Sequence, residues 1–313
     1  MSDIKTRIYF CGGGSTNIGA MYDATSENVC FLDSSSANLL TNPVPEDRFY
    51  KIPGTDGAGG NPAYMMPFAK KHAPEMLKRF EPGVTNIVVI TGGGGSGSTI
   101  GPNIVDLLLA DGHTVFVIMI MGTDSTRRIR NTMNTGKNLE MISQKRGEVV
   151  AVSEVWNTNG EAAADQEVLF LLDSIVALTD QQNERLDTMD VKNFIQYNNL
   201  TSVEPQLSTL TIHTSRAEAA AVLEPISVAS LYTDATKDVP FGTPFVRTVG
   251  ICPNEAKLPG DQLHFVINSV GVTAMMDRLE EERVKVNTTQ SSFRQRRSIV
   301  TVDDVAEDGF IAD

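Results

Sequence analysis

Apolar residues gather in short runs through the first half of the chain, and segments with helical spacing of apolar positions lie between these runs. Residues 87–90 and 113–121 are the clearest runs, and both are typical of buried strands in a parallel sheet. Shorter runs at 6–10, 29–32 and 149–152 predict further strands, and helices are expected at 18–21, 64–72, 100–108 and 133–142. Strand and helix thus alternate over residues 1–163, which predicts a doubly wound α/β domain.

A nearly all-apolar segment divides the chain in two. Val168 to Leu178 is apolar around most of a helical circumference, as in a helix buried between two layers. We therefore expect residues 164–199 to form a central helix, a loop and a helix at 191–197. Residues 200–286 are predicted as a smaller α+β domain, with strands at 207–213, 245–251 and 264–267, a helix at 217–223 and a long final helix from Val270. Residues 287–313 form a tail with an acidic end.

Composition restricts the partners and the compartment. The 313 residues carry a net charge of −13, which argues against nucleic acid or an anionic membrane as a direct partner. The chain has no run of 18 apolar residues and no signal-peptide pattern at its first residues. Its three cysteines are scattered, without metal-binding spacing, and no side-chain metal site is expected. We expect a cytoplasmic protein.

Glycine-rich loops carry the candidate chemistry. Residues 92–99 lie between a predicted strand and a predicted helix, and residues 12–17 and 56–62 form two more such loops. Glycine lets the backbone approach a ligand closely, and the free N–H groups at a helix start favour an anion such as phosphate. A flexible linker is disfavoured by the flanking strand and helix, and no lysine precedes the Ser/Thr as a Walker loop requires.

A dinucleotide site is the rival interpretation. Gly92, Gly94 and Gly97 satisfy the G-x-G-x-x-G spacing, and Asp33 ends a strand about 20 residues after the first glycine turn. Against it, Asn17 stands where the third glycine of that turn belongs, and three glycine loops exceed what one pyrophosphate needs. An NAD-dependent oxidoreductase using the first turn and Asp33 remains the alternative.

Two acids follow the central helix. Asp187 and Asp190 are three residues apart at the start of the predicted helix 191–197, so they lie near one helix face. Acids at a helix start are ordinary capping residues, and a catalytic role is the second possibility.

These motifs together resemble the tubulin/FtsZ superfamily of GTPases. The loop from Gly93 resembles the tubulin signature loop, and residues 57–62, GAGGNP, resemble a loop of bacterial FtsZ. The acids match the FtsZ pattern N-x-D-x-x-D, although Arg185 replaces its asparagine. The resemblance covers about residues 7–285 in order of elements. It is strongest to the bacteriophage tubulins, through the short connection into the acids, residues 261–271 and the short acidic tail.

The resemblance implies a GTPase that binds GTP/GDP with Mg²⁺ and polymerises head to tail into dynamic cytoskeletal filaments. Each subunit would complete the site of the next, and the filament would position phage DNA in the host cytoplasm. A nucleotide-binding assembly protein that does not hydrolyse GTP is a further possibility. The acidic tail, residues 303–313, is expected to dock on a neighbouring subunit.

The resemblance also assigns roles to individual residues. Asp187 and Asp190 would orient or polarise the attacking water. Asp124 and Arg128 would lie near the ribose and phosphates, and Asn157, Asn159 and Asp165 near the guanine edge. The phosphates would be wrapped by residues of all three glycine loops: Gly12, Gly13, Gly14, Asn17, Gly57, Ala58, Gly59, Gly60, Asn61, Gly93, Gly94, Gly95, Ser96, Gly97, Ser98 and Thr99.

Overall fold

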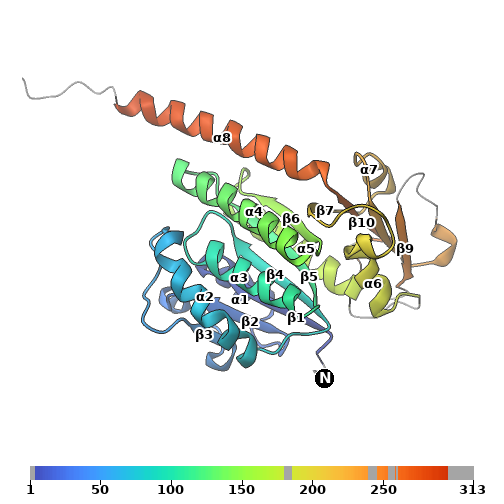
Figure 1. Cartoon of the computed structure of the whole chain (residues 1–313), viewed down its shortest axis with the longest axis horizontal. Coiled ribbons are helices and arrows are strands. Elements are labelled where there is room, and N and C mark those ends of the chain that lie inside the picture. The colour runs from blue at the N-terminus through green and yellow to red at the C-terminus, as the bar shows by residue number, and fades with distance from the viewer. Residues whose placement is uncertain (1–3, 180–184, 239–244, 253–257, 259, 295–313) are drawn as a thin grey trace, which may run out of the picture.

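A computed structural model describes residues 4–179, 185–238, 245–252, 258 and 260–294 (Figure 1). The described residues form one mixed sheet in the strand order β3-β2-β1-β4-β5-β6-β7-β10-β8-β9. The strands are β1 (Thr6–Cys11), β2 (Val29–Asp33), β3 (Phe49–Lys51), β4 (Thr85–Thr91), β5 (Thr114–Met121), β6 (Val150–Trp156), β7 (Leu207–His213), β8 (Ser227–Tyr232), β9 (Val246–Ile251) and β10 (Gln262–Asn268). The α-helices are α1 (Gly13–Asp23), α2 (Pro62–Arg79), α3 (Gly97–Ala110), α4 (Thr126–Arg146), α5 (Glu161–Thr179), α6 (Thr188–Ile195), α7 (Arg216–Ala220) and α8 (Val270–Arg294).

Helices cover both faces of the parallel part of the sheet. Along β1, Ile8 and Phe10 pack into one apolar core with α1, α5 and α6, while Tyr9 and Cys11 pack into a second core with α2, α3 and α4. Because side chains alternate between faces, a strand covered on both sides must be apolar at every position. This explains the continuous apolar runs and confirms the predicted α/β class.

The strands from β3 to β7 pair in parallel, so their carboxyl ends share one edge, here called the carboxyl edge. The strands β7, β10 and β8 pair antiparallel, and β8 and β9 pair in parallel. The sheet therefore continues across the predicted boundary near residue 200, and the division into domains stays a prediction.

The buried helix α5 connects the two edges of the sheet. It follows β6 at the carboxyl edge, and near its end Thr179 Oγ1 lies 2.9 Å from Thr6 Oγ1 at the start of β1. The next helix, α6, lies at this second edge, where Lys192 Nζ donates to the Gly112 carbonyl, just before β5. We call it the amino edge.

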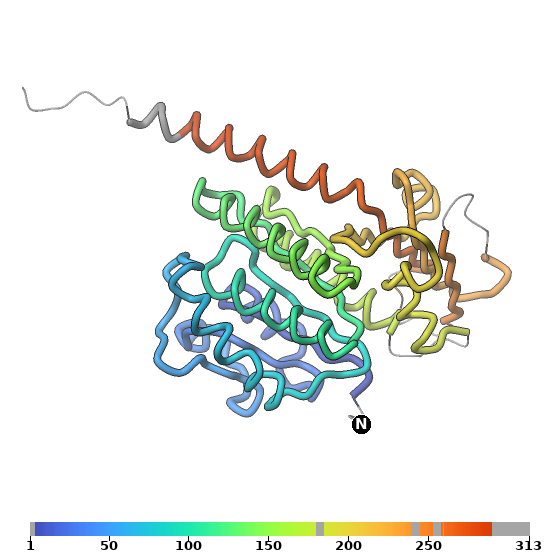
Figure 2. Tube along the Cα trace, viewed as in Figure 1, coloured from blue at the N-terminus to red at the C-terminus, as the bar shows by residue number. Residues whose placement is uncertain are grey.

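Some elements differ from those predicted. Strand β8 was not expected, although Ser227–Tyr232 is wholly buried. Helix α4 begins at Thr126, seven residues before the predicted start, because Ser125 caps it by accepting from the Arg128 N–H. Helix α8 has 25 residues, and the C-terminal part of α8 projects beyond α4 (Figures 1 and 2).

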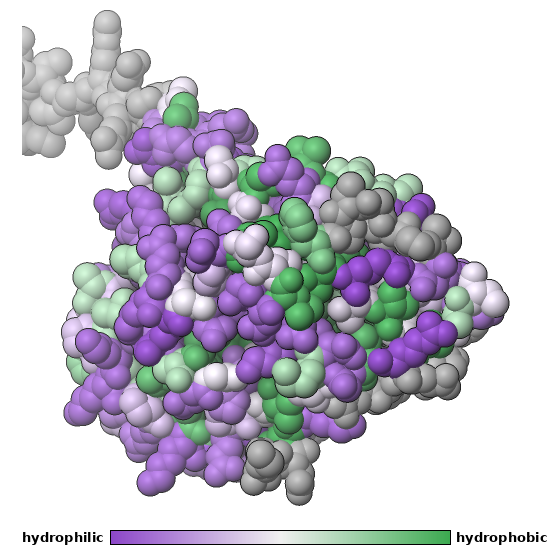
Figure 3. All heavy atoms as spheres, turned by 45° about the vertical axis from the view of Figure 1, so that its right-hand side comes forward, coloured by the Kyte–Doolittle hydropathy of each residue, from purple (hydrophilic) through white to green (hydrophobic). Residues whose placement is uncertain are grey.

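The face shown in Figure 3 is mainly polar. Hydrophilic side chains (purple) cover most of the face in Figure 3, with apolar side chains (green) between them. Among the described residues, no helix is long and apolar enough to cross a membrane.

Candidate nucleotide-binding site

Two helix N-termini meet at the carboxyl edge. Helix α1 begins at Gly13, directly after β1, and α3 begins at Gly97, after β4. A Cβ on Gly12 would lie 2.6 Å from the Gly97 nitrogen, so the two backbones touch where only glycine fits. Neither helix is capped by the side chain of its N-cap residue. Their first N–H groups therefore form an anion-binding corner.

The third glycine loop packs against this corner. Gly57, Gly59 and Gly60 have φ of 92°, 55° and 69°, which favours glycine. A Cβ on Gly95 would lie 2.5 Å from the Ala58 Cβ and 2.9 Å from the Asn61 nitrogen. The structure thus brings the three predicted loops together. The Asn61 side chain is used to cap α2, accepting from the Tyr64 N–H at 3.2 Å.

A buried serine, not predicted from the sequence, links two of these loops. Ser34 Oγ lies 2.5 Å from Ser96 Oγ, and the Ser34 carbonyl accepts from Gly57 N at 3.0 Å. The neighbouring Asp33 carboxylate accepts from Ser34 N at 2.7 Å, and burial raises the pKa of Asp33 to about 6. The polar run that follows β2 was the available signal.

Helix α4 holds the same loops from the other side. The Asn131 side chain donates to the carbonyls of Gly60 and Gly93 at 3.1 and 3.2 Å, and Thr135 Oγ1 donates to the Gly92 carbonyl at 2.9 Å. Both side chains are buried. Their spacing of four residues places them on one helix face, and this was the signal that sequence reasoning missed.

The two arginines after β5 have different surroundings. Arg128 forms an ion pair with Asp124, four residues earlier in the chain, with 2.6 Å between the guanidinium nitrogen and the carboxylate oxygen. The guanidinium of Arg127 instead lies 3.2 Å from the position of a Cβ on Gly60. Within the described ranges, Arg127 forms no ion pair or hydrogen bond. It was not among the predicted site residues.

The predicted guanine contacts lie at the turn from β6 into α5. Asn157 is half-buried, and its Oδ1 is buried without a hydrogen-bond partner among the described residues. Asn159 is exposed. Asp165 lies near the start of α5, and its pKa is raised by burial and by the charge of Glu161. On α1, the Asn17 Oδ1 accepts from the Asn42 side chain at 3.0 Å.

The paired acids lie at the amino edge, away from the glycine loops. They form a reciprocal capping box at the start of α6: Asp187 accepts from Asp190 N at 2.9 Å, and Asp190 accepts from Asp187 N at 3.1 Å. Helix α5, of 19 residues and about 28 Å long, separates them from the carboxyl edge. The structure therefore does not bring the acids and the loops together within one chain.

The corner fits a phosphorylated ligand. Glycine backbones, two uncapped helix starts and an arginine converge there, and a side chain at Gly12 or Gly95 would clash with the neighbouring loop. Among the described residues, no three His, Cys, Asp or Glu side chains form a group that could hold a metal. A magnesium ion would therefore depend largely on phosphate oxygens, as is usual for this ion.

Parallel strands with three glycine loops at their carboxyl edge, together with a central buried helix, define the tubulin/FtsZ class. In agreement, an FtsZ from M. jannaschii has the same fold, with a TM-score of 0.60 at 14% identity over 84% of this chain and 90% of the FtsZ chain. Residues 186–272 match the family model of the phage tubulin-like protein C-terminal domain.

Closer relatives match along the entire chain. A phage tubulin-like protein of Pseudomonas phage PhiPA3 is 40% identical over 99% of this chain and 100% of its own. The phage tubulin PhuZ, solved with GDP, has a TM-score of 0.88 at 33% identity, and a TubZ protofilament of bacteriophage PhiKZ has 0.87 at 34%. Both alignments cover 99% of this chain and 100% of the other. The chain belongs to the family of phage tubulin-like proteins. The oxidoreductase alternative based on Asp33 finds no support among these relatives.

Proposed function

We propose that this phage tubulin-like protein binds GTP at the carboxyl edge, assembles head to tail, and hydrolyses GTP where two subunits meet. One observation carries the proposal: the glycine loops and the acids of α6 lie at opposite edges of one chain, at the two ends of α5. Stacking two subunits along α5 places the amino edge of one against the carboxyl edge of the next. The GDP-bound PhuZ and the TubZ protofilament, as relatives, support guanine-nucleotide binding and assembly.

In this proposal the three loops bind the phosphates through backbone N–H groups. Residues 93–99 and 12–17 provide the two helix starts, and residues 57–61 cover the terminal phosphate. Arg127 joins them as a cation at Gly60, while Asp124 and Arg128 lie nearer the ribose. Bound Mg²⁺ neutralises phosphate charge. Asn157, Asn159 and Asp165 are proposed to contact the guanine edge, and the unpartnered Oδ1 of Asn157 supports this.

Asp187 and Asp190 are proposed to act on the nucleotide of the adjoining subunit. Each carboxylate has further acceptor capacity beyond the backbone N–H that it caps. Each is thus able to orient or polarise a water molecule at the junction. The filament is proposed to position phage DNA in the host cytoplasm, without direct contact of this protein with nucleic acid or membrane.

The dependence of activity on concentration tests the shared site. Phosphate release per subunit from GTP should rise with protein concentration, and light scattering should rise with GTP but not with GDP, ATP or NAD. A rate per subunit that stays constant on dilution would contradict the shared site. Scattering without phosphate release would identify an assembly protein that does not hydrolyse GTP.

A further inference from the structure

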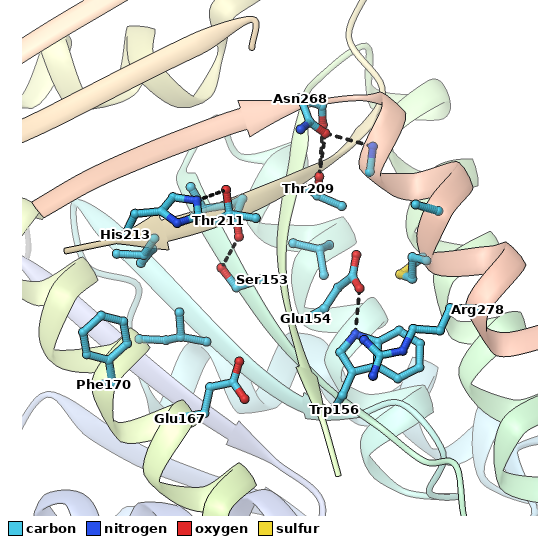
Figure 4. Close-up of a pocket in the computed structure, with 17 residues that line it drawn as sticks. Ser153, Glu154, Trp156, Glu167, Phe170, Thr209, Thr211, His213, Asn268 and Arg278 are labelled. Atoms are coloured by element: carbon cyan, nitrogen blue, oxygen red, sulfur yellow. Dashed lines mark hydrogen bonds between the residues drawn. The ribbon is translucent and has the colours of Figure 1, made fainter. Parts of the chain in front are cut away.

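Strands β6 and β7 separate soon after they pair. Only Val150–Val152 pair with Leu207–Thr209, because β7 follows β10 along its length. Beyond the last pair, Ser153 Oγ still donates to the Leu210 carbonyl at 2.9 Å. A cavity of about 450 Å³ opens there between the two strands, α5 and the start of α8 (Figure 4). This volume lies in the range of small-molecule sites, about 300–1,000 Å³.

The cavity has an apolar wall and an acidic side. The apolar wall includes Phe170 and Leu171 of α5, Ile212 of β7, and Ala274 and Met275 of α8. The carboxylates of Glu154 on β6 and Glu167 on α5 also line it (Figure 4).

The charges that line the cavity do not balance. Arg278 of α8 lies over the Trp156 ring, 3.8 Å from its centroid, and lowers the pKa of both carboxyls. Burial is the larger effect and raises the pKa of Glu154 and of Glu167. Burial lowers the pKa of His213, which favours its neutral form. The lining thus holds two carboxyl groups and one guanidinium, so one carboxyl group has no cation of its own among the lining residues.

The Glu154 carboxylate can accept further hydrogen bonds. Trp156 Nε1 donates to Glu154 Oε2 at 2.9 Å, which fixes the carboxylate beside the ring. An ionised carboxylate has two oxygens and about four acceptor positions, so the indole uses a small part of its capacity. Glu154 is half-buried and Glu167 is exposed, and a carboxylate in such a place is stabilised by a nearby cation that donates hydrogen bonds to it.

We propose that this cavity binds a small organic monocation with a flat apolar body. Its amine or amidinium group lies between Glu154 and Glu167, and its body packs on Phe170 and Met275. The site is separate from the glycine loops, which offer backbone donors and an arginine to an anion. The proposal is independent of GTP hydrolysis.

The fluorescence of the full chain provides the test, because Trp156 is its single tryptophan. Titration with benzamidine should change the emission saturably and raise the melting temperature. Benzamide, of the same shape but uncharged, should bind at least about 10-fold more weakly. Glu154→Gln or Glu167→Gln should weaken benzamidine binding about 10-fold, whereas Glu281→Gln, an exposed change on α8, should leave it unaltered.

The proposal is overturned by any of three results: no saturable change with benzamidine, binding of benzamide as tight as that of benzamidine, or glutamine variants that bind benzamidine as tightly as the unaltered chain. If a glutamine variant fails to fold, the contrast between benzamidine and benzamide on the unaltered chain still decides.

Discussion

Asp187 and Asp190 have a structural role in addition to the proposed catalytic one, so the substitution must separate the two. Asparagine keeps the capping acceptor and loses the charge. We expect Asp190→Asn to bind GTP and assemble with unchanged thermal stability, but to lose about 10²–10⁴-fold of its hydrolysis. Asp190→Ala should lose hydrolysis and also some stability, because the capping-box hydrogen bond from Asp187 N is lost. Asp187→Asn should have the same effects on GTP binding, assembly, thermal stability and hydrolysis as Asp190→Asn. If Asp190→Asn fails to bind GTP, the acid belongs to the binding site or the fold.

Arg127 and Arg130 form a matched pair, since both are exposed arginines of α4 and only Arg127 has its guanidinium against Gly60. Arg127→Ala should weaken the binding of GTP about 10-fold and the binding of GDP less. The reason is that Arg127 lies against Gly60, and residues 57–61 are proposed to cover the terminal phosphate, which GDP lacks. Arg130→Ala should leave both affinities unchanged. Calorimetric titration of each nucleotide measures this, and an equal loss for GTP and GDP would place Arg127 elsewhere.

The buried Asp33 predicts a pH effect on stability. Its pKa is raised from 3.8 to about 6, so folding favours the protonated form, and its contribution is lost as pH rises through 6. The shift corresponds to at most about 3 kcal/mol. Asp33→Asn should therefore stabilise the nucleotide-free protein at pH 8 and have little effect below pH 4. Urea unfolding at the two pH values decides, and a gain that is equal at both would exclude the ionisation of Asp33 as its cause.

Single residues were predictable where their type is diagnostic. The glycine loops are recognisable in the sequence, because glycine is the residue that lets a backbone approach a ligand or another backbone closely. Ser34, Arg127 and Asn131 were missed because their partners lie 38 to 71 positions away along the chain. A local signal, such as the polar run after β2 or the four-residue spacing of Asn131 and Thr135, does not identify such distant partners.

Among the elements, the contact of α3 with β4 requires a glycine. A Cβ on Gly101 would lie 1.9 Å from the Ile90 Cγ2, whereas a Cβ on Gly136 of α4 would meet Met275 at an ordinary 3.4 Å. Gly101→Ala should therefore destabilise the protein by about 1–3 kcal/mol, and Gly136→Ala should stabilise it by about 0.5–1 kcal/mol. Urea unfolding curves give both values. Destabilisation by both substitutions would show that α4 is as tightly packed as α3.

The elements were predicted best where they are apolar on all sides, as in β4, β5 and α5. Strand β8 was missed although it is buried, because Ser227–Tyr232 mixes serine and alanine with its apolar residues. The pairing of β6 with β7, and hence the single continuous sheet, depends on tertiary packing that a linear pattern does not contain.

For the whole molecule, the acidic tail is the predicted polymerisation element, and it lies outside the described residues. Residues 303–313 hold five acids and no basic residue, together with Val305, Phe310 and Ile311. Exposed ion pairs contribute about 0–1 kcal/mol each, but the contact would recur at every subunit. Deleting 303–313 should raise the critical concentration and leave the GTP affinity of the monomer intact. Sedimentation with GTP at low and at physiological salt measures the critical concentration. At physiological salt, charges farther apart than about 8 Å are largely screened from each other. Pelleting equal to that of the full chain would leave the tail as a solvated end.

The position of α5 between the two edges has a consequence for a growing polymer. In a protofilament of n subunits, only n − 1 carboxyl edges face the acids of a neighbour. If GTP is hydrolysed where subunits meet, as proposed, one terminal subunit keeps its triphosphate until another subunit joins it, while those behind it hydrolyse theirs to diphosphate. The two ends of such a protofilament would then differ in the nucleotide that they carry.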